Sequence, residues 1–267
     1  TVEPVVITAE EISAGAASEK TLSRYRDLVG DEPLLLASRL PGISVAVSKD
    51  RLRDVDVLSE RNVQLIVADD AFQHRRMGRD ADIVLVDACC PFGNGWIAPA
   101  GILRESPSVL SRASAVVVTK SDQVEPERLE RLVGELSRFV PKERLFFSRI
   151  SLLNWRRWNG GWKDAAGERP DSVLAFSAIG SPESFRRSLE AGGVDILKEH
   201  RFKDHYRYRM EDMAALEASL EECGASCMVC TEKDVYNLPQ EWRPTRDILV
   251  PFISTVLDEE ARFRECL

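Results

Sequence analysis

The chain has 267 residues, enough for one large domain or two smaller ones. It is 44% hydrophobic and 30% charged, a balance that excludes a largely disordered chain. Its formal net charge of −8 disfavours a broad nucleic-acid-binding surface, which would be basic, but not a local basic pocket. No apolar run reaches the roughly 18 residues of a membrane-spanning helix, and no signal peptide is visible.

The six cysteines favour reduced thiols, and hence a cytoplasmic protein. Cys223, Cys227 and Cys230 are close enough in the sequence to suggest a metal site. However, a second CxxC pair is absent, and the surrounding SCMVCTEKD has the pattern of a buried strand. A zinc site is therefore the less favoured interpretation.

Short runs of β-branched residues recur along the chain and predict strands. Because these runs are apolar at consecutive positions, both faces of each strand should be buried, as in a parallel sheet. The runs occupy residues 4–8, 63–68, 82–88, 114–120, 172–178, 226–232 and 247–252.

Amphipathic helices are predicted between several of these strands. In 125–140 the apolar residues recur at helical spacing, and similar patterns cover 181–193 and 209–224. Alternating strands and helices predict an α/β fold, doubly wound, with mostly parallel sheets in two lobes.

The segment 150–172 interrupts this alternation. Its NGG, residues 159–161, lies between aromatic-rich flanks and predicts a hairpin turn. We expect a first lobe over 1–149, a hinge hairpin over 150–172 and a second α/β lobe over 173–267.

Asp69 and Asp70 follow the apolar run 63–68 and precede the polar cluster QHRR. Ligands of doubly wound sheets bind beyond the carboxyl ends of strands, and paired carboxylates suit a hard cation such as Mg²⁺. An aspartate after a strand is also a common helix cap. Both interpretations remain open on pattern alone.

Three further segments carry groups capable of chemistry. The glycine-rich loop 91–105 would let Arg104 project into whatever the loop surrounds. VGDEP (29–33) places Asp31 and Glu32 at a predicted helix start, and in RFKDHYRYR (201–209) His205 follows an aspartate that could orient its imidazole. A solvated loop, an acidic helix start and a structural histidine are the corresponding alternatives.

A phosphate-binding loop is missing from these patterns. No G-x-x-x-x-G-K-[ST] occurs, and the nearest text, AGAASEKT (14–21), lacks the required glycines. The patterns therefore predict an α/β protein with a polyvalent anionic or metal-bound ligand, and no more.

Six segments taken together resemble the tetraacyldisaccharide 4′-kinases of lipid A biosynthesis. They run in that family's order and cover nearly the whole chain: VGDEP, DDAFQHRRMGRDADIVLVDA, PFGNGWIAPAGILRE, AFSAIGSPESF, FKDHYRY and TEKD. Ala71 stands where the family usually has glycine. The resemblance implies a P-loop-NTPase-like core joined to a smaller C-terminal α/β lobe. It also implies a Walker A loop and a membrane-associating helix upstream of VGDEP, both outside this chain, so we expect the chain as given to be an inactive fragment.

The resemblance further implies transfer of the ATP γ-phosphate to the 4′-hydroxyl of a lipid-linked glucosamine disaccharide 1-phosphate. This reaction would take place at the cytoplasmic face of the inner membrane of a Gram-negative-type bacterium, with Mg²⁺. By motif match, the catalytic residues are Asp31 as base and His205 as its partner. The implied metal ligands are Asp69, Asp70 and Glu32, and the implied substrate-binding residues are Arg51, Gln73, His74, Asn94 and Arg104.

Two rival functions remain open. TKSD (119–122) is similar to the guanine-reading N-K-x-D of G proteins, although Thr119 replaces asparagine, so a nucleotide hydrolase is one rival. The other is a non-catalytic paralogue that binds the lipid A precursor. Comparing ATP with GTP binding tests the first, and a Walker A sequence upstream would remove the second.

Overall fold

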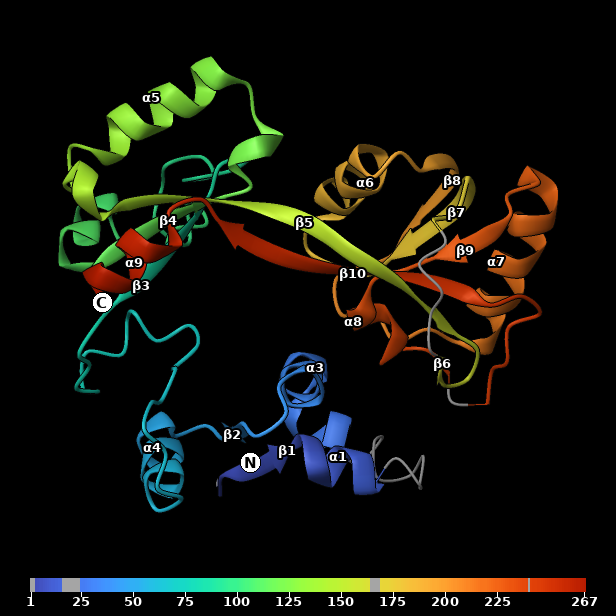
Figure 1. Cartoon of the computed structure of the whole chain (residues 1–267), viewed down its shortest axis with the longest axis horizontal. Coiled ribbons are helices and arrows are strands. Elements are labelled where there is room, and N and C mark those ends of the chain that lie inside the picture. Colours follow the sequence, from blue (N-terminus) through green and yellow to red (C-terminus); the bar gives the residue numbers. More distant parts are fainter. Residues whose placement is uncertain (1–2, 16–24, 164–168, 240) are drawn as a thin grey trace. The chain divides into compact units, whose positions relative to one another are not determined.

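The computed structural model of the protein describes residues 3–15, 25–163, 169–239 and 241–267 (Figure 1). The chain divides into two compact units, the first made of Thr1–Asp69 with Asn154–Phe252 and the second of Asp70–Leu153 with Ile253–Leu267. Two long strands, β5 (Leu145–Trp158) and β10 (Ile248–Leu257), run through both units. These bounds differ from the lobes expected at 1–149 and 173–267, and that domain division stays a prediction.

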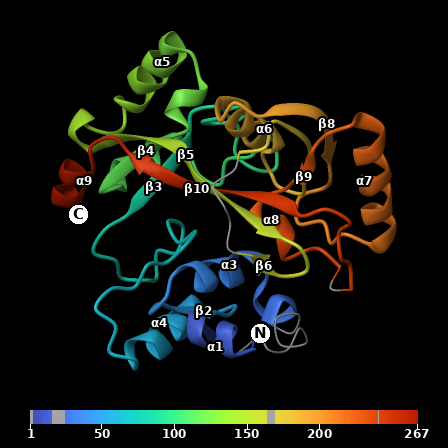
Figure 2. The same cartoon turned by 45° about the vertical axis from the view of Figure 1, so that its right-hand side comes forward.

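The first unit contains a parallel sheet with the strand order β10-β9-β7-β8. Its strands β7 and β9 are buried on both faces, which explains their uninterrupted apolar sequences. Helices α6 and α7 lie on opposite faces of these strands in Figures 1 and 2, so the unit is doubly wound. The elements are β7 (Ser172–Ser177), α6 (Pro182–Ala191), β8 (Asp195–Arg201), α7 (Met210–Cys223), β9 (Cys227–Val229) and α8 (Glu232–Val235).

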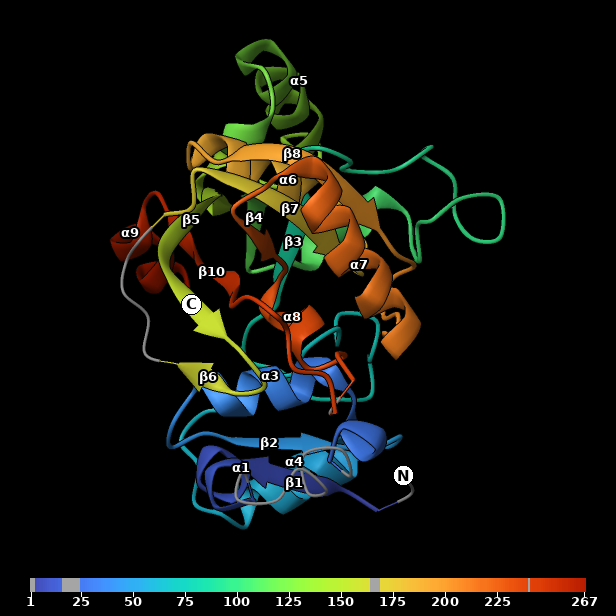
Figure 3. The ribbon, with the colours of Figure 1, turned by 90° about the vertical axis from the view of Figure 1, so that its right-hand side faces the viewer.

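The N-terminal part of the first unit forms a small layer of its own. Strands β1 (Val5–Thr8) and β2 (Ser44–Val47) pair antiparallel, and helix α3 (Asp31–Arg39) packs Leu34 and Ala37 into their core. Figure 3 shows α3 between these strands and α8, which α3 contacts. The remaining elements of this part are α1 (Ala9–Gly15) and α4 (Arg51–Ser59).

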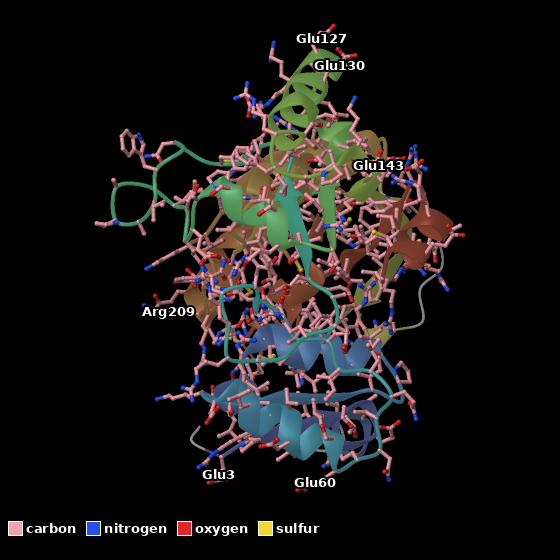
Figure 4. All side chains as sticks on the ribbon, turned by 90° about the vertical axis from the view of Figure 1, so that its left-hand side faces the viewer. Glu3, Glu60, Glu127, Glu130, Glu143 and Arg209 are labelled. Carbon is pink, nitrogen blue, oxygen red and sulfur yellow. The ribbon has the colours of Figure 1, made fainter. Side chains whose placement is uncertain are left out.

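The second unit is built on three parallel strands in the order β3-β4-β5. Alternate residues of β4 face opposite layers: Val116 and Val118 pack with α5, whereas Ala115 and Val117 belong to a core cluster with residues of α9 (Figure 1). The acidic face of α5 points away from the sheet, as its labelled glutamates show in Figure 4. The elements are β3 (Ile83–Asp87), η1 (Pro107–Arg112), β4 (Ala115–Thr119), η2 (Ser121–Gln123), α5 (Pro126–Leu136), η3 (Lys142–Arg144) and α9 (Glu260–Cys266).

The hairpin predicted at NGG is confirmed. Strand β5 pairs antiparallel with β6 (Trp162–Lys163), Trp158 lies opposite Trp162, and the N–H of Asn159 donates to the carbonyl of Gly161 at 3.1 Å. Residues 164–168, the next part of the expected hinge, lie outside the described residues, as does most of AGAASEKT. The α/β class with mostly parallel sheets is confirmed as well.

The strand predicted at 63–68 is wrong. These residues have no strand hydrogen bonding, and the side chains of Leu65 and Val67 are 79% and 84% exposed. A strand needs a neighbouring strand to satisfy its backbone groups, and within the described residues this segment has none. Asp69 and Asp70 consequently follow an extended, exposed segment instead of a buried strand.

Candidate active site

Asp31 is the first residue of helix α3 and is held below the surface, with 8% of its area exposed. The preceding Gly30 has φ +90°, a backbone conformation that glycine adopts without strain and that directs the chain into the helix. A carboxylate at this end is favoured by the partial positive charge of the helix N-terminus. The VGDEP sequence therefore sets both the position of Asp31 and its negative charge.

Three segments far apart in the sequence meet at the Asp31 carboxylate. Nδ1 of His205 lies 3.2 Å from both carboxylate oxygens, and Nδ2 of Asn237 donates to Oδ2 at 3.2 Å. The backbone N–H of Glu32 donates to Oδ1 at 3.1 Å. The structure thus joins the two residues predicted to be catalytic and adds Asn237, which no sequence signal had indicated.

The environment of Asp31 favours its ionised form. Burial alone would raise the pKa of Asp31, but the hydrogen bond from Asn237, the charge of Lys233 and the contact with His205 outweigh burial. The pKa of Asp31 therefore lies below its ordinary value, and the carboxylate is charged at neutral pH. In contrast, the side chain of His205 is 53% exposed and accessible from solvent.

Lys233 supplies a positive charge beside Asp31 and His205. Its Nζ lies 2.7 Å from Oε1 of Glu32 and 3.5 Å from Nε2 of His205. Glu32 is held in this ion pair, and its role as a metal ligand stays a prediction. TEKD contains Lys233, but no local pattern indicates that this residue reaches Glu32, about 200 positions earlier.

Asp234, the last residue of TEKD, is a buried carboxylate that is linked to His205 through hydrogen bonds. Its Oδ1 accepts hydrogen bonds from the N–H of Ala178 at 2.7 Å and from the hydroxyl of Tyr208 at 2.8 Å. The carbonyl of Ala178 in turn accepts from the N–H of His205 at 3.1 Å. Burial raises the pKa of Asp234, although these hydrogen bonds oppose the shift.

The backbone of His205 is in the left-handed region, with φ 57°. A residue other than glycine in this region carries a modest strain that its surroundings must compensate. Here the hydrogen bond to Ala178 and the contact with Asp31 hold His205 in place. His205 is thus held at two points, its backbone N–H and the Nδ1 atom of its imidazole.

The second unit holds a separate charged group around Asp70. Nη1 of Arg104 donates to both carboxylate oxygens of Asp70, at 2.7 and 2.6 Å, and Asp70 also has a left-handed backbone, with φ 51°. Both side chains are exposed. In the first unit, the neighbouring Asp69 accepts a hydrogen bond from Arg51 through its backbone carbonyl. The predicted residues therefore interact in pairs, Asp70 with Arg104 and Asp69 with Arg51.

Three further predicted substrate-binding residues lie in the loops of the second unit. Gln73 and His74 are exposed in the turn after Asp70. Asn94 forms hydrogen bonds within its own loop: its Nδ2 donates to the carbonyl of Ala100 at 2.9 Å, and its Oδ1 accepts from the N–H of Trp96 at 3.2 Å. Asn94 is therefore a clamp that closes the loop.

Comparison with known proteins decides the family. A model of the tetraacyldisaccharide-1-P 4′-kinase family, LpxK, matches residues 13–267. The chain belongs to this family. Family members include the tetraacyldisaccharide 4′-kinase of Syntrophobacter fumaroxidans, to which the chain is 36% identical over 89% of its own length and 62% of the relative. For the tetraacyldisaccharide 4′-kinase of Anaeromyxobacter dehalogenans strain 2CP-C, the identity is 37% over 78% of the chain and 56% of the relative.

A solved LpxK structure has the same fold. The chain is similar to LpxK from Aquifex aeolicus in complex with ATP, with a TM-score of 0.61 and 25% identity over 89% of this chain and 67% of that one. Against the curated relatives, the chain spans about three fifths of their length, 62% and 56% in the two cases above.

The carboxylates expected to hold Mg²⁺ already have partners or lie apart from other metal-binding side chains. Within the described residues, no three His, Cys, Asp or Glu side chains form a group able to hold a metal ion. Glu32 and Asp70 are each engaged by a cation, Lys233 and Arg104. These oxygen ligands suit Mg²⁺ in type, and their assignment to Mg²⁺ stays a prediction. No helix in the described part of the chain is long and apolar enough to cross a bilayer.

Proposed function

We propose that this family member takes part in phosphorylating the 4′-hydroxyl of a lipid-linked glucosamine disaccharide 1-phosphate, an intermediate of lipid A synthesis, with ATP as donor. The observation that carries the proposal is the Asp31–His205 pair, fixed by Asn237 and Lys233. The names of the relatives support the reaction, and the ATP complex of the Aquifex aeolicus protein supports the donor.

In this proposal Asp31 and His205 act together on the acceptor hydroxyl. ATP supplies the γ-phosphoryl group: the hydroxyl oxygen bonds to the γ-phosphorus, the bond from that phosphorus to the β,γ-bridging oxygen breaks, and ADP leaves. As that oxygen–phosphorus bond forms, the hydroxyl proton passes to the Asp31 carboxylate, which is charged at neutral pH and therefore able to accept it. His205 keeps the carboxylate oriented through Nδ1–H, and Lys233 adds positive charge beside the pair.

The other predicted residues would bind charged groups. Phosphoryl transfer depends on positioning and charge neutralisation, for which arginine is well suited. We assign contacts with phosphate or sugar groups to Arg51, Gln73, His74, Asn94 and Arg104. Asp69, Asp70 and Glu32 are proposed as Mg²⁺ ligands by their chemical type, and none of the steps above depends on them.

The proposed site of action is the cytoplasmic face of the inner membrane, where the protein would be a peripheral partner of its lipid acceptor. The net charge of −8 agrees with a protein that does not bind nucleic acid.

The test is a phosphoryl-transfer assay with a chain that also carries a phosphate-binding loop. The chain is extended at its N-terminus with the Walker A segment of a family relative and incubated with Mg²⁺, γ-labelled ATP and the disaccharide 1-phosphate in detergent. We expect label at the 4′ position and a large loss of rate in the Asp31→Asn variant. Acceptor binding without transfer would favour the non-catalytic paralogue, and GTP hydrolysis without acceptor would favour the G-protein-like hydrolase.

A further inference from the structure

The loop between β3 and η1 exposes large apolar side chains. Trp96 and Ile102 are 66% and 70% exposed, and Ile97 between them is exposed as well. Figures 3 and 4, drawn from opposite sides, both show this segment extending away from the strands of the second unit. The three side chains form what we call the apolar tip. The catalytic proposal gives none of them a role.

The apolar tip is carried by an ordered loop. Ile97 and Leu103 form a β-bridge, and the N–H of Ala98 donates to the carbonyl of Leu103 at 2.9 Å. Asn94 clamps the loop from inside, and a Cβ at Gly101 would lie 2.1 Å from the carbonyl oxygen of Trp96, so glycine is required there. The loop therefore has a defined backbone conformation in which the side chains of the apolar tip remain exposed.

Arginines surround the base of the same loop. Arg75 pairs with Glu105 at 3.0 Å, and the guanidinium of Arg112 lies 4.6 Å from the ring centroid of Phe72. Arg75, Arg104 and Arg112 are exposed and pair with the two carboxylates of Asp70 and Glu105, and the exposed Arg76 follows Arg75 in the sequence. Positive charge therefore exceeds negative charge behind the apolar tip.

We propose that the apolar tip inserts into the interface of an anionic lipid bilayer while the arginines contact its headgroups. Tryptophan favours the headgroup level, aliphatic side chains gain by leaving water, and basic residues are attracted to anionic lipid. Three side chains are far fewer than the roughly 20–30 residues per side of a stable protein interface. The lipid surface is thus the partner whose chemistry fits both the tip and its base.

This inference rests on the proposed function only for its choice of partner. It specifies which surface of the chain would meet the membrane that carries the acceptor. Vesicle binding is measured without nucleotide or acceptor, whereas the kinase assay uses acceptor dispersed in detergent. Failure of either proposal is therefore recognised independently of the other.

The first experiment measures co-sedimentation of the chain with vesicles of phosphatidylglycerol and phosphatidylethanolamine. We expect Ile102→Ser and Trp96→Ser each to reduce binding on the order of tenfold, because burying one large apolar side chain is worth at least that factor. The matched control is Leu65→Ser, which removes a side chain that is 79% exposed in another segment and should leave binding unchanged. Equal binding by all three variants and the unchanged chain would overturn the proposal.

The second experiment uses the fluorescence of the five tryptophans. Trp96 is exposed, Trp162 is half-buried, and the other three, Trp155, Trp158 and Trp242, are buried. Vesicles with brominated acyl chains should quench part of the emission of the unchanged chain, and Trp96→Phe should still bind but lose that quenching. Quenching that persists in Trp96→Phe would place the contact elsewhere and refute the proposal.

A third variant tests the basic part of the surface. Arg75→Ala combined with Arg76→Ala should reduce binding to the anionic vesicles by up to about 25-fold, since each basic residue near an anionic surface contributes about a factor of five. The same variant should bind phosphatidylcholine vesicles no less than the unchanged chain does. If the arginine changes had no effect on binding to anionic vesicles, the proposal that these arginines contact anionic headgroups would be contradicted.

Discussion

The two charged groups of the molecule differ in how they are held. The Asp31 group lies in the first unit, where a buried carboxylate receives hydrogen bonds from separate segments and a second buried carboxylate supports it. The Asp70–Arg104 group lies in the second unit, where two exposed side chains pair on loops. One group has its geometry set by packing, and the other has its geometry set by side-chain charges in solvent.

This difference separates the roles that each group can perform. Proton transfer needs a base within hydrogen-bonding reach and a fixed orientation, which the buried group provides. Binding a charged, flexible substrate needs groups that can exchange one partner for another, and an exposed ion pair does so at little cost. We therefore expect changes in the first group to alter turnover and changes in the second to alter affinity.

The largest expected effect is on turnover. In the chain extended with a Walker A segment, Asp31→Asn or His205→Ala should lower kcat by about 10²–10⁴-fold with a much smaller change in KM, because a general base acts mainly in the transition state. Steady-state kinetics with varied acceptor give both constants. A normal kcat in Asp31→Asn would mean that Asp31 is not the base and only stabilises the start of helix α3.

The next effect concerns stability. Asp234→Ala should lower the free energy of unfolding by roughly 2–5 kcal/mol, since it leaves the buried N–H of Ala178 and hydroxyl of Tyr208 without their acceptor. Urea denaturation measures the loss. The matched control is Asp171→Ala, at an exposed position, which should cost less than about 0.5 kcal/mol. Equal stability of the two variants would show that the support beneath His205 is not needed.

A smaller effect appears in the pH profile of the extended chain. Lys233 is one of the causes that lower the pKa of Asp31, so Lys233→Met should raise that pKa. Activity that requires ionised Asp31 would then be lost at a higher pH as the solution is acidified. Lys203→Met, which removes an exposed lysine near His205, is the control and should leave the acid limb in place. A shift to lower pH in Lys233→Met would contradict this electrostatic assignment.

The smallest effect on stability is expected in the exposed group. Arg104→Ala should change the free energy of unfolding by less than about 1 kcal/mol, as is usual for a solvent-exposed ion pair. Its effect should appear instead as a raised KM for the anionic acceptor in the extended chain. A loss of stability as large as that of Asp234→Ala would mean that the two groups are held in the same way.

The sequence predicted the fold well where local pattern determines structure. The helices near 125–140 and 209–224, the buried strands β4 and β7 and the turn at Asn159–Gly161 follow from side-chain periodicity and glycine. The strand at 63–68 was predicted wrongly because an apolar run forms a strand only when another strand pairs with it. Local pattern carries no information about that partner.

The site was predictable only in part for a related reason. The resemblance indicated that Asp31 and His205 belong together, and the structure brings them within 3.2 Å. Lys233 and Asn237 join them through contacts that span about 200 positions, and no local pattern marks such contacts. A single sequence also does not reveal that the amide of Asn94 closes its own loop.

The most direct test of the account is a double-mutant cycle on Asp31 and His205 in the extended chain. The proposed unit predicts that Asp31→Asn with His205→Ala is about as slow as the slower single variant, because residues that act together are not additive. The quantity to measure is kcat at saturating ATP and acceptor for the four proteins of the cycle. If the two single losses multiplied in the double variant, Asp31 and His205 would be acting independently, and the central claim would be contradicted.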